Sequence, residues 1–269
     1  MMLGLPYTLS EIAQAGLAQD LFQGQPKPEP LRYLAYDSRQ ISHGRQTVFI
    51  ALKTSNRDGH DFIEDAYQKG VRNFLVARRP PRKNLNFALC DDPLEALQLW
   101  AMHHRRRFSY PVVGITGSNG KTTVKEWVAT LLEPFLQLVK SPMSFNSQLG
   151  VPISLLQMHP HAELALIEAG ISKPGEMERL ASLIQPELGI FTHLGAAHAE
   201  GFESEAQKFA EKITLFQDSR LVLAGNQQSW VRDQLQTQFK NLALVGQKSA
   251  GSAKLEVISA RVTSEGWAL

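Results

Sequence analysis

The chain has 269 residues, of which 43% are hydrophobic and 20% charged, and its formal net charge is +2. This composition is typical of a globular protein with one large or two medium domains, and it argues against nucleic acid as the main partner. The single cysteine, Cys90, excludes an internal disulfide framework and favours a reducing compartment. Because we find neither a signal peptide nor an apolar stretch of membrane-spanning length, we expect a cytoplasmic protein.

Residues 1–107 predict a small mixed α/β domain. Thr8 and Glu11 form a capping-box pattern at a helix start, and Gly70 is a natural helix stop. The segment VFIAL, Val48–Leu52, has the composition of a buried strand. The basic run His103–Phe108 follows a helix-like segment, and we interpret it as a solvated helix end before a linker. A phosphate-facing patch is the alternative.

Residues 108–269 predict a three-layer α/β domain, with a mostly parallel sheet covered by helices on both faces. Apolar strand candidates alternate there with amphipathic stretches of helix length. The strand candidates are PVVGI, LALIEAG, LGIFTHLG, RLVLAG and LALVG. Since ligands of such sheets gather at the carboxyl ends of the strands, the residues after these segments are the candidates for chemistry.

Residues 114–122, GITGSNGKT, resemble the phosphate-loop pattern G-x-x-x-x-G-K-[ST], with one additional residue between the outer glycines, and they lie between a predicted strand and a predicted helix. Glycines let backbone amides turn toward phosphates, and the helix N-terminus adds positive potential. Lys121 supplies charge, and the Thr122 hydroxyl can reach a magnesium ion. The loop therefore predicts binding of a nucleoside triphosphate; a glycine-rich turn with an ordinary surface lysine is the alternative.

Other polar residues lie near the ends of later segments. Glu168 ends a strand candidate, and a carboxylate beside a phosphate loop is the expected second ligand of magnesium, although a plain strand-end charge is the alternative. His193 is predicted inside its strand and His198 just beyond it, where a lone histidine is more often polar surface. Lys212, on a predicted helix, is by itself typical of a solvated lysine.

Several stretches, in the same order, resemble the Mur ligases of peptidoglycan synthesis. They are YDSRQISHGRQTVFIAL, NRDGHDFIEDAYQKGVRNFLV, GITGSNGKTTVKEW, SFNSQLGVPISLL, LIEAGISKPGEMERLASLIQPELGIFTHLGAAHAEGF and EAQKFAEKITLF. The resemblance implies an ATP-dependent amide ligase that joins D-alanyl-D-alanine to UDP-N-acetylmuramoyl-tripeptide through an acyl phosphate. Three alternatives stay open: another Mur ligase, a ligase like folylpolyglutamate synthetase, and a non-catalytic module that binds a nucleotide or a UDP-sugar.

The resemblance also implies roles for individual residues. The ATP-binding residues would be Gly117, Ser118, Asn119, Gly120, Lys121, Thr122 and Thr123. The ligands of Mg²⁺ would be Thr122, Glu168, His198 and Lys212, and the catalytic residues Lys121, His198 and Lys212. Lys212 matches a lysine that is carbamylated in this family; a carbamate needs a neutral amine to form, and it turns a cation into an oxygen ligand.

The resemblance further implies a site for the UDP-muramyl substrate in the first domain. The substrate-binding residues would be Ser38, Arg39, Asn56, Arg57, Asp58 and His60, with Asn146 in the second domain. An arginine and loop amides suit a diphosphate. For the first-domain residues, turn and helix-cap chemistry is the alternative.

Two features depart from the family pattern. MSFNSQ stands where the family often has G-N-x-N-N, and LVLAGNQQSW lacks the usual strand ending; both are similar to a ligase fused ahead of an alanine racemase. The final segment, KLEVISARVTSEGWAL, predicts a strand, a turn at Ser264–Gly266 and a second strand that has barely begun. We therefore expect an N-terminal fragment, with a truncated second domain and no C-terminal ligase domain, that is inactive alone.

Overall fold

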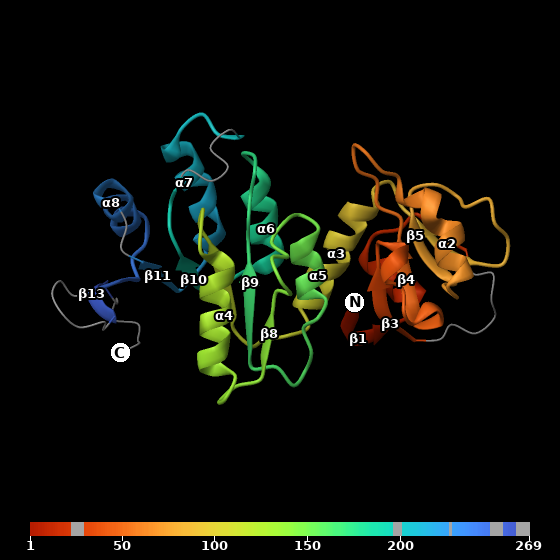
Figure 1. Ribbon diagram of the computed structural model, residues 1–269, viewed down its shortest axis with the longest axis horizontal. Helices are drawn as coiled ribbons and strands as arrows, with labels where there is room; N and C mark the ends of the chain where they lie inside the picture. The colour runs from red at the N-terminus through yellow and green to blue at the C-terminus, as the bar shows by residue number, and fades with distance from the viewer. Residues whose placement is uncertain (23–29, 196–200, 226–227, 248–254, 262–269) are drawn as a thin grey trace. The chain divides into compact units, whose positions relative to one another are not determined.

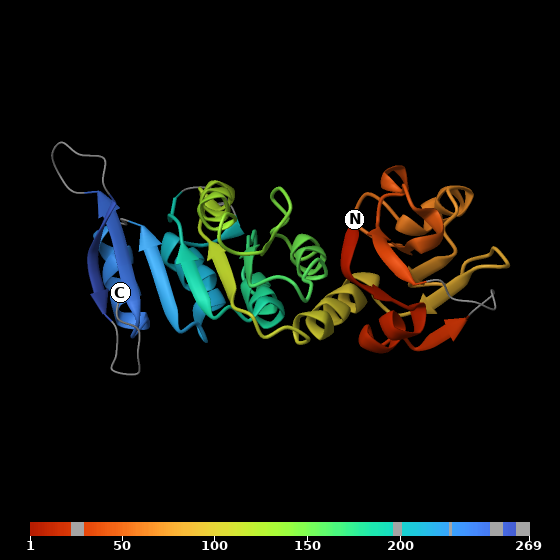
Figure 2. The same ribbon diagram turned by 90° about the horizontal axis from the view of Figure 1, so that it is seen from below.

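The computed structural model describes residues 1–22, 30–195, 201–225, 228–247 and 255–261 (Figures 1 and 2). The chain divides into two compact units. The first consists of Met1–Phe108 with Leu155–Pro160, and the second of Ser109–Ser154 with His161–Leu269. Among the described residues, no helix has the length and apolar character needed to cross a membrane.

The first unit is built on a six-stranded sheet with the order β1-β3-β4-β5-β6-β2. The four central strands are parallel, and β1 and β2 are antiparallel to their neighbours. The strands are β1 (Met2–Tyr7), β2 (Asp20–Phe22), β3 (Leu31–Ala35), β4 (Thr47–Ile50), β5 (Asn73–Val76) and β6 (Asn86–Leu89). The helices are α1 (Leu9–Ala15), α2 (Ile63–Gln68) and α3 (Pro93–Arg105), with the 3-10 turns η1 (Ser38–Gln40), η2 (Gly44–Gln46) and η3 (Gly59–Phe62).

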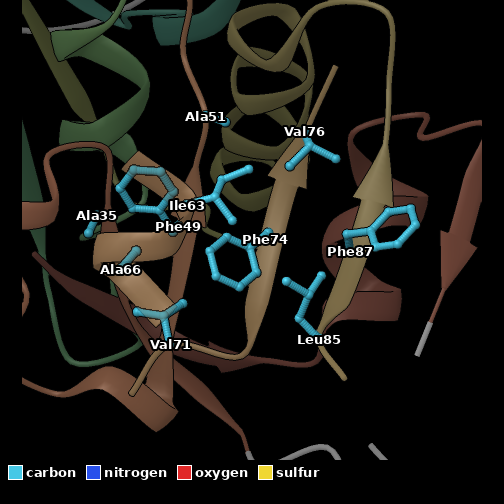
Figure 3. Packing of buried hydrophobic residues seen from close by; sticks show 10 residues of the cluster. All are labelled: Ala35, Phe49, Ala51, Ile63, Ala66, Val71, Phe74, Val76, Leu85 and Phe87. Carbon is cyan, nitrogen blue, oxygen red and sulfur yellow. The ribbon is translucent and has the colours of Figure 1, made fainter. Parts of the chain in front are cut away.

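The core of this unit lies between α2 and the central strands (Figure 3). Phe49 of β4 and Phe74 of β5 meet edge to face, with ring centroids 6.1 Å apart, and Ile63 of α2 is buried in the same cluster. Every residue of β4 and β5 is buried, as expected for parallel strands covered on both faces. The predicted capping box at the start of α1 is confirmed, since Glu11 N lies 3.2 Å from Thr8 Oγ1.

The basic run at the end of α3 is partly buried. His104 and Arg105 lie in the interior, so their predicted position on a solvated helix end is wrong. His104 Nε2 donates to the Met158 carbonyl at 2.9 Å, which leaves Nδ1 to accept the Tyr7 hydroxyl at 2.5 Å. Burial is the main cause that lowers the pKa of His104, to about 4, so the imidazole is neutral at physiological pH.

Leu155–Pro160 packs with the first unit, whereas the sequence analysis assigned all of 108–269 to the second domain. Gly4 N donates to the Leu156 carbonyl at 2.8 Å, and His104 holds the Met158 carbonyl. A Cβ at Gly4 would stand 1.7 Å from that Met158 oxygen. This close approach requires glycine at position 4. No local sequence pattern predicts the contact.

The second unit is built on a seven-stranded sheet with the order β13-β12-β11-β10-β7-β9-β8, parallel except for β13. Its strands are β7 (Val112–Thr116), β8 (Leu138–Lys140), β9 (Leu164–Glu168), β10 (Leu188–Phe191), β11 (Leu221–Gly225), β12 (Leu242–Gln247) and β13 (Leu255–Arg261). Its helical segments are α4 (Lys121–Leu132), α5 (Gly150–Leu155, ending in the first unit), α6 (Glu176–Ile184), α7 (Glu205–Ile213), η5 (Thr214–Phe216) and α8 (Ser229–Gln238). The sheet confirms the predicted fold class; the turn expected at Ser264–Gly266 lies outside the described residues.

Helices cover both faces of this sheet. In Figure 2, α4 (yellow-green) lies on one face and α6 and α7 (green to blue) lie on the other. Val113 and Ile115 of β7 pack with Ala129 of α4 in one buried cluster. On the opposite face, a Cβ at Gly189 would stand 2.5 Å from the ring of Phe216, so glycine lets η5 press against the sheet.

Candidate functional site

The turn between β7 and α4 depends on two glycines. Gly117 has φ +150°, and a Cβ there would stand 2.1 Å from Thr192 Oγ1, so a side chain at this position would displace the loop. Gly120 is the N-cap of α4 in the left-handed region, with φ +82°. The loop therefore has the backbone shape that the phosphate-loop pattern predicted.

The end of β10 holds this loop from the side. Ser118 N donates to the His193 carbonyl at 2.6 Å, and Thr192 Oγ1 donates to the Asn119 carbonyl at 2.7 Å. His193 lies beyond the end of β10 and its side chain is exposed, so its predicted place inside the strand is wrong. The backbone at this position supports the loop.

The start of α4 offers positive potential toward the turn. Its N-cap provides no side-chain hydrogen bond, so the amides of the first turn are available to an anion. Lys121 Nζ donates to the carbonyls of Gly117 at 2.8 Å and Ser118 at 3.2 Å, which folds the side chain back over the loop. Burial lowers the pKa of Lys121, and the charge of Glu168 counteracts part of that shift.

A carboxylate and a hydroxyl meet beside the loop. Glu168 ends β9, the parallel neighbour of β7, and its side chain is fully buried. Thr122 Oγ1 donates to Glu168 Oε2 at 3.0 Å and lies 3.4 Å from Ser144 Oγ, while Asn146 Nδ2 lies 3.5 Å from the same Oε2. These oxygens suit a hard cation such as Mg²⁺. The structure thus brings together three predicted site residues: Thr122, Glu168 and Asn146.

Lys212 approaches the loop from α7 and is buried, with 1% exposure. Its Nζ donates to the Gly117 carbonyl at 3.3 Å. Burial, followed by the charges of Lys121 and Lys208, lowers the pKa of Lys212 to about 7. The solvated lysine suggested by its local sequence is therefore wrong, and a large fraction of this amine is neutral near pH 7.

Two further buried lysines were missed by the sequence analysis. Lys208 lies one turn before Lys212 on α7 and donates to the Gly195 carbonyl. Lys125 lies on α4, and its Nζ is 2.9 Å from Glu168 Oε1. Helical spacing was an available signal, because Lys125 is three residues after Thr122 and so shares its side of α4.

His198, predicted as a catalytic residue and metal ligand, lies outside the described residues. Within them, no group of three or more His, Cys, Asp or Glu side chains could hold a metal ion. Of the four predicted ligands of Mg²⁺, Thr122 and Glu168 are the two that lie within hydrogen-bond distance of each other in the described part of the chain.

In the first unit, Ser38 and Arg39 lie on η1, directly after β3. The guanidinium of Arg39 bonds to Asp37, with Nη2 2.6 Å from Oδ2, although the Arg39 side chain is 74% exposed. The hydrogen bond from Arg39 is the main cause that lowers the pKa of Asp37 to about 2, and the charge of Arg57 contributes. Ser38 is buried, and its carbonyl accepts a 2.9 Å hydrogen bond from Lys69.

The predicted substrate residues after β4 form a helix cap and an exposed turn. Asp58 Oδ1 accepts hydrogen bonds from His60 N at 2.9 Å and His60 Nδ1 at 2.7 Å. Because the Ala77 amide donates to His60 Nε2 at 3.0 Å, the imidazole carries its proton on Nδ1. The backbone hydrogen bond from His60 and the side chain of Arg78 hold the pKa of Asp58 well below its usual range.

Asn56 and Arg57 are exposed in the same turn, and the Arg57 guanidinium lies 4.0 Å from the centroid of the Phe62 ring. Since β3 and β4 are parallel neighbours, this turn and the Ser38–Arg39 turn lie at the same edge of the sheet. The structure therefore groups the predicted substrate residues of the first unit at one edge, and it also gives Asp58 and His60 the helix-cap role left open by the sequence.

A glycine-shaped turn, an uncapped helix start and a Thr–Glu pair at the carboxyl edge of a parallel sheet define the second unit as a phosphate-loop domain of α/β class. The family profile described as "Mur ligase middle domain" matches residues 115–266. This match covers more than half of the chain, and the chain belongs to the Mur ligase family.

Two relatives at more than 30% identity share one name. The chain is 32% identical over 200 residues to the UDP-N-acetylmuramoyl-tripeptide--D-alanyl-D-alanine ligase of Bacillus subtilis, covering 72% of this chain and 43% of that protein. It is 35% identical over 180 residues to the Escherichia coli protein of the same name, covering 67% of this chain and 39% of that protein. The chain spans about half, or less, of the length of these relatives.

Solved structures show the same similarity. MurF ligase from Thermotoga maritima in complex with ADP matches with a TM-score of 0.70 and 27% identity, over 81% of this chain and 51% of that one. MurF from Acinetobacter baumannii matches with a TM-score of 0.79 and 21% identity, over 91% of this chain and 54% of that one, which shows a shared fold.

Proposed function

We propose that this chain forms part of an ATP-dependent ligase that joins D-alanyl-D-alanine to UDP-N-acetylmuramoyl-tripeptide in peptidoglycan precursor synthesis. The observation that carries the proposal is the 3.0 Å contact between Thr122 and the buried Glu168, directly beside a phosphate loop of matching shape. The shared name of the curated relatives supports the choice of substrates.

ATP would bind with its phosphates against the turn Gly117–Gly120 and the first amides of α4. The Lys121 ammonium, which lies against two loop carbonyls, would turn from them to the phosphates. Thr122, Glu168, Lys212 and His198 would hold Mg²⁺, of which the Thr–Glu pair is the part supported by geometry. Bound magnesium would neutralise charge on the transferred phosphoryl group.

The chemistry explains why such a site is needed. A carboxylate is a poor electrophile, so its oxygen first attacks the γ-phosphorus of ATP, releasing ADP and leaving an acyl phosphate. The amine of D-alanyl-D-alanine then attacks the acyl carbon, the carbon–oxygen bond to phosphate breaks, and the amine loses a proton. The carboxylate and the phosphates of ATP are both negatively charged and repel one another. Lys121 and the loop amides would hold them together and stabilise the negative charge of the transition state.

Lys212 would act as a carbamate. A neutral amine attacks carbon dioxide and releases a proton, and the lowered pKa of about 7 supports this reaction near physiological pH. The product would exchange a cation, buried beside two other lysines, for an anionic oxygen ligand of magnesium.

The first unit would hold the UDP end of the muramyl substrate. Arg39, Arg57 and Asn56 have exposed side chains at one sheet edge and would contact the diphosphate and the uridine. Asp58, His60 and Ser38 would shape the turns that present them, and Asn146 would contact the muramyl part of the substrate beside Glu168.

Calorimetric titration of this chain with MgATP, and separately with UDP-N-acetylmuramoyl-tripeptide, tests both halves of the proposal. We expect each ligand to bind. Binding of neither would overturn it, and binding of the UDP-tripeptide alone would favour a substrate-binding module without catalysis. In the native gene product, phosphate release from ATP should require both the UDP-tripeptide and D-alanyl-D-alanine, and dependence on a different amino acid would contradict the assignment.

A cytoplasmic location, a following ligase domain and a fused alanine racemase stay predictions. Sequencing the gene beyond the codon for Leu269 checks the last two directly.

A further inference from the structure

Lys125 is a fully buried cation that the reaction above does not use. It lies on α4, one turn after Lys121, and its side chain has 0% exposure. The ammonium lies 2.6 Å from each of the carbonyls of Ser141 and Met143, and 2.9 Å from Glu168 Oε1. Burying a lysine is costly unless its charge is compensated, so this position requires an explanation.

The two oxygens of Glu168 have different surroundings. Oε2 accepts from Thr122 Oγ1 and lies near Asn146. Oε1 is buried without an aligned hydrogen bond from the described residues, and the ion pair with Lys125 is what compensates it. Lys125 therefore holds one carboxylate oxygen and leaves the other facing Thr122, which fixes the orientation of the carboxylate plane.

Lys125 also fixes the segment after β8. The two carbonyls that it binds belong to residues 141–143, and the next residues carry Ser144 and Asn146, which approach Thr122 and Glu168. Ser141 contributes from the same segment, because its hydroxyl accepts a 3.1 Å hydrogen bond from the Glu168 amide. One ammonium thus joins α4, the end of β9 and the segment 141–146.

We propose that Lys125 is a positioning residue that orients Glu168, and with it the segment 141–146, for the magnesium ion of a bound nucleotide. The inference rests on the proposed function in one respect only, the identity of the ligand as a magnesium nucleotide. Groups that orient a metal ligand typically change metal affinity by roughly 10–100-fold when they are removed.

The test compares the Kd of ADP in the presence of Mg²⁺ and in EDTA, by titration calorimetry, for the wild-type chain and Lys125→Met. We expect Mg²⁺ to strengthen ADP binding by a factor that is roughly 10–100-fold smaller in Lys125→Met, while the Kd in EDTA changes less than about twofold. Equal weakening with and without Mg²⁺ would mean that the loop itself has collapsed, and it would overturn the inference.

Lys140→Met is the matched control. Lys140 bonds to Glu126 at 2.8 Å, the same glutamate that lies 3.1 Å from Lys125, but it is part-exposed on β8 and contacts Glu133 on its other side. The same chemical change should therefore leave the Mg²⁺ factor unaltered. The double variant Lys125→Met with Glu168→Gln removes the unpaired buried charge, and it should recover stability but not the Mg²⁺ factor.

A crystal structure of Lys125→Met tests the positioning role independently of ligand binding. If the wild-type chain binds no ADP, that result counts against the proposed function alone, and the crystal structure still decides the inference. We expect Glu168 Oε2 to leave the 3.0 Å contact with Thr122 Oγ1. An unmoved carboxylate and an unmoved segment 141–146 would overturn the positioning role. If the single variant does not fold, the distance from the side-chain amide at position 168 to Thr122 Oγ1 and the position of segment 141–146 are compared between the double variant and Glu168→Gln alone.

Discussion

The basic side chains of the two candidate sites differ in burial and in pairing with acidic groups. Around the phosphate loop, Lys121 and Lys212 come from two helices and donate to the same Gly117 carbonyl, and burial lowers both pKa values. At the sheet edge of the first unit, Arg39 and Arg78 are more exposed, and each already bonds to an aspartate.

The charges around the phosphate loop repel one another, whereas those at the sheet edge are paired with opposite charges. Buried ammonium groups that face one another destabilise a fold, and an anionic ligand or a carbamate would relieve them. Exposed arginine–aspartate pairs contribute little to stability and can exchange one oxygen partner for another. We infer that the buried lysines of the second unit lower its stability in the absence of a bound phosphate. The charged pairs of the first unit, in contrast, mainly stabilise turns.

The largest expected effect concerns Lys212, whose pKa is lowered to about 7. In an unfolded chain this amine titrates near 10.4, so between about pH 7 and 10 the unfolded state binds the additional proton and stability rises with pH. Lys212→Met should raise the free energy of unfolding at pH 7 by about 1–4 kcal/mol and remove the rise with pH. Urea unfolding at pH 7, 8 and 9, monitored by hydrogen exchange of β7 peptides, measures the free energy of unfolding and its dependence on pH.

Lys240→Met, which replaces an exposed lysine of the same unit, is the control for this experiment. It should change neither the stability nor its pH dependence. A Lys212→Met chain that is less stable than wild type at pH 7 would show that the amine is well compensated, and the contrast between the two sites would fail.

The next largest effect is on nucleotide binding. Lys121→Ala should weaken ADP binding by about 10–100-fold, since hydrogen bonds to charged groups contribute about 1.5–3 kcal/mol and each 1.4 kcal/mol is tenfold. The part-exposed position predicts an unchanged fold. Titration calorimetry gives the affinity, with Lys240→Ala as the control. Unchanged ADP affinity would remove this lysine from the phosphate site.

In the first unit the expected effect is on stability. Asp58 caps η3, and loss of a capping side chain costs about 1–2 kcal/mol, so Asp58→Ala should destabilise this unit by that amount at pH 7. The pKa of Asp58 is lowered by folding, so its contribution is complete above about pH 4 and is lost as the pH falls further. Urea unfolding should therefore show wild type and variant converging toward pH 3.

The neighbouring Asp61→Ala is the matched comparison, because Asp61 is 69% exposed and lies 3.9 Å from the same Arg78. Asp61→Ala should leave the free energy of unfolding nearly unchanged at both pH 7 and pH 3. If Asp58→Ala is equally neutral, the cap is not a structural device, and a direct role of Asp58 in substrate binding gains support.

The fold and the phosphate loop were predictable because both depend on local patterns. Alternation of apolar strands with amphipathic helices specifies a parallel sheet, and the glycine spacing specifies a turn that the structure shows at Gly117 and Gly120. Glu168 was predictable for a related reason, since the carboxyl end of a strand next to the loop must lie at the same edge.

The buried lysines were not predictable from residue type. Lys125, Lys208 and Lys212 all belong to amphipathic helices, where lysine is normally solvated, and only tertiary contacts with carbonyls and a carboxylate explain their burial. His104 was misjudged for the same reason, because its partners, Tyr7 and Met158, are distant in sequence. Such contacts leave no periodic signal of their own; for Lys125, the spacing from Thr122 indicates the side of α4 but not the burial.

The smallest expected effect concerns Arg39 in the first unit. Arg39→Ala should leave the stability of this unit nearly unchanged, because an exposed ion pair contributes little. If Arg39 contacts a diphosphate, it must give up part of its bonding to Asp37, so only the net hydrogen-bond energy is gained. We therefore expect UDP to bind about three- to fivefold more weakly, measured by titration calorimetry. Arg32→Ala, which replaces an exposed arginine within β3, should leave UDP affinity unchanged, and an equal loss in both variants would indicate general attraction of the basic surface rather than a diphosphate contact by Arg39.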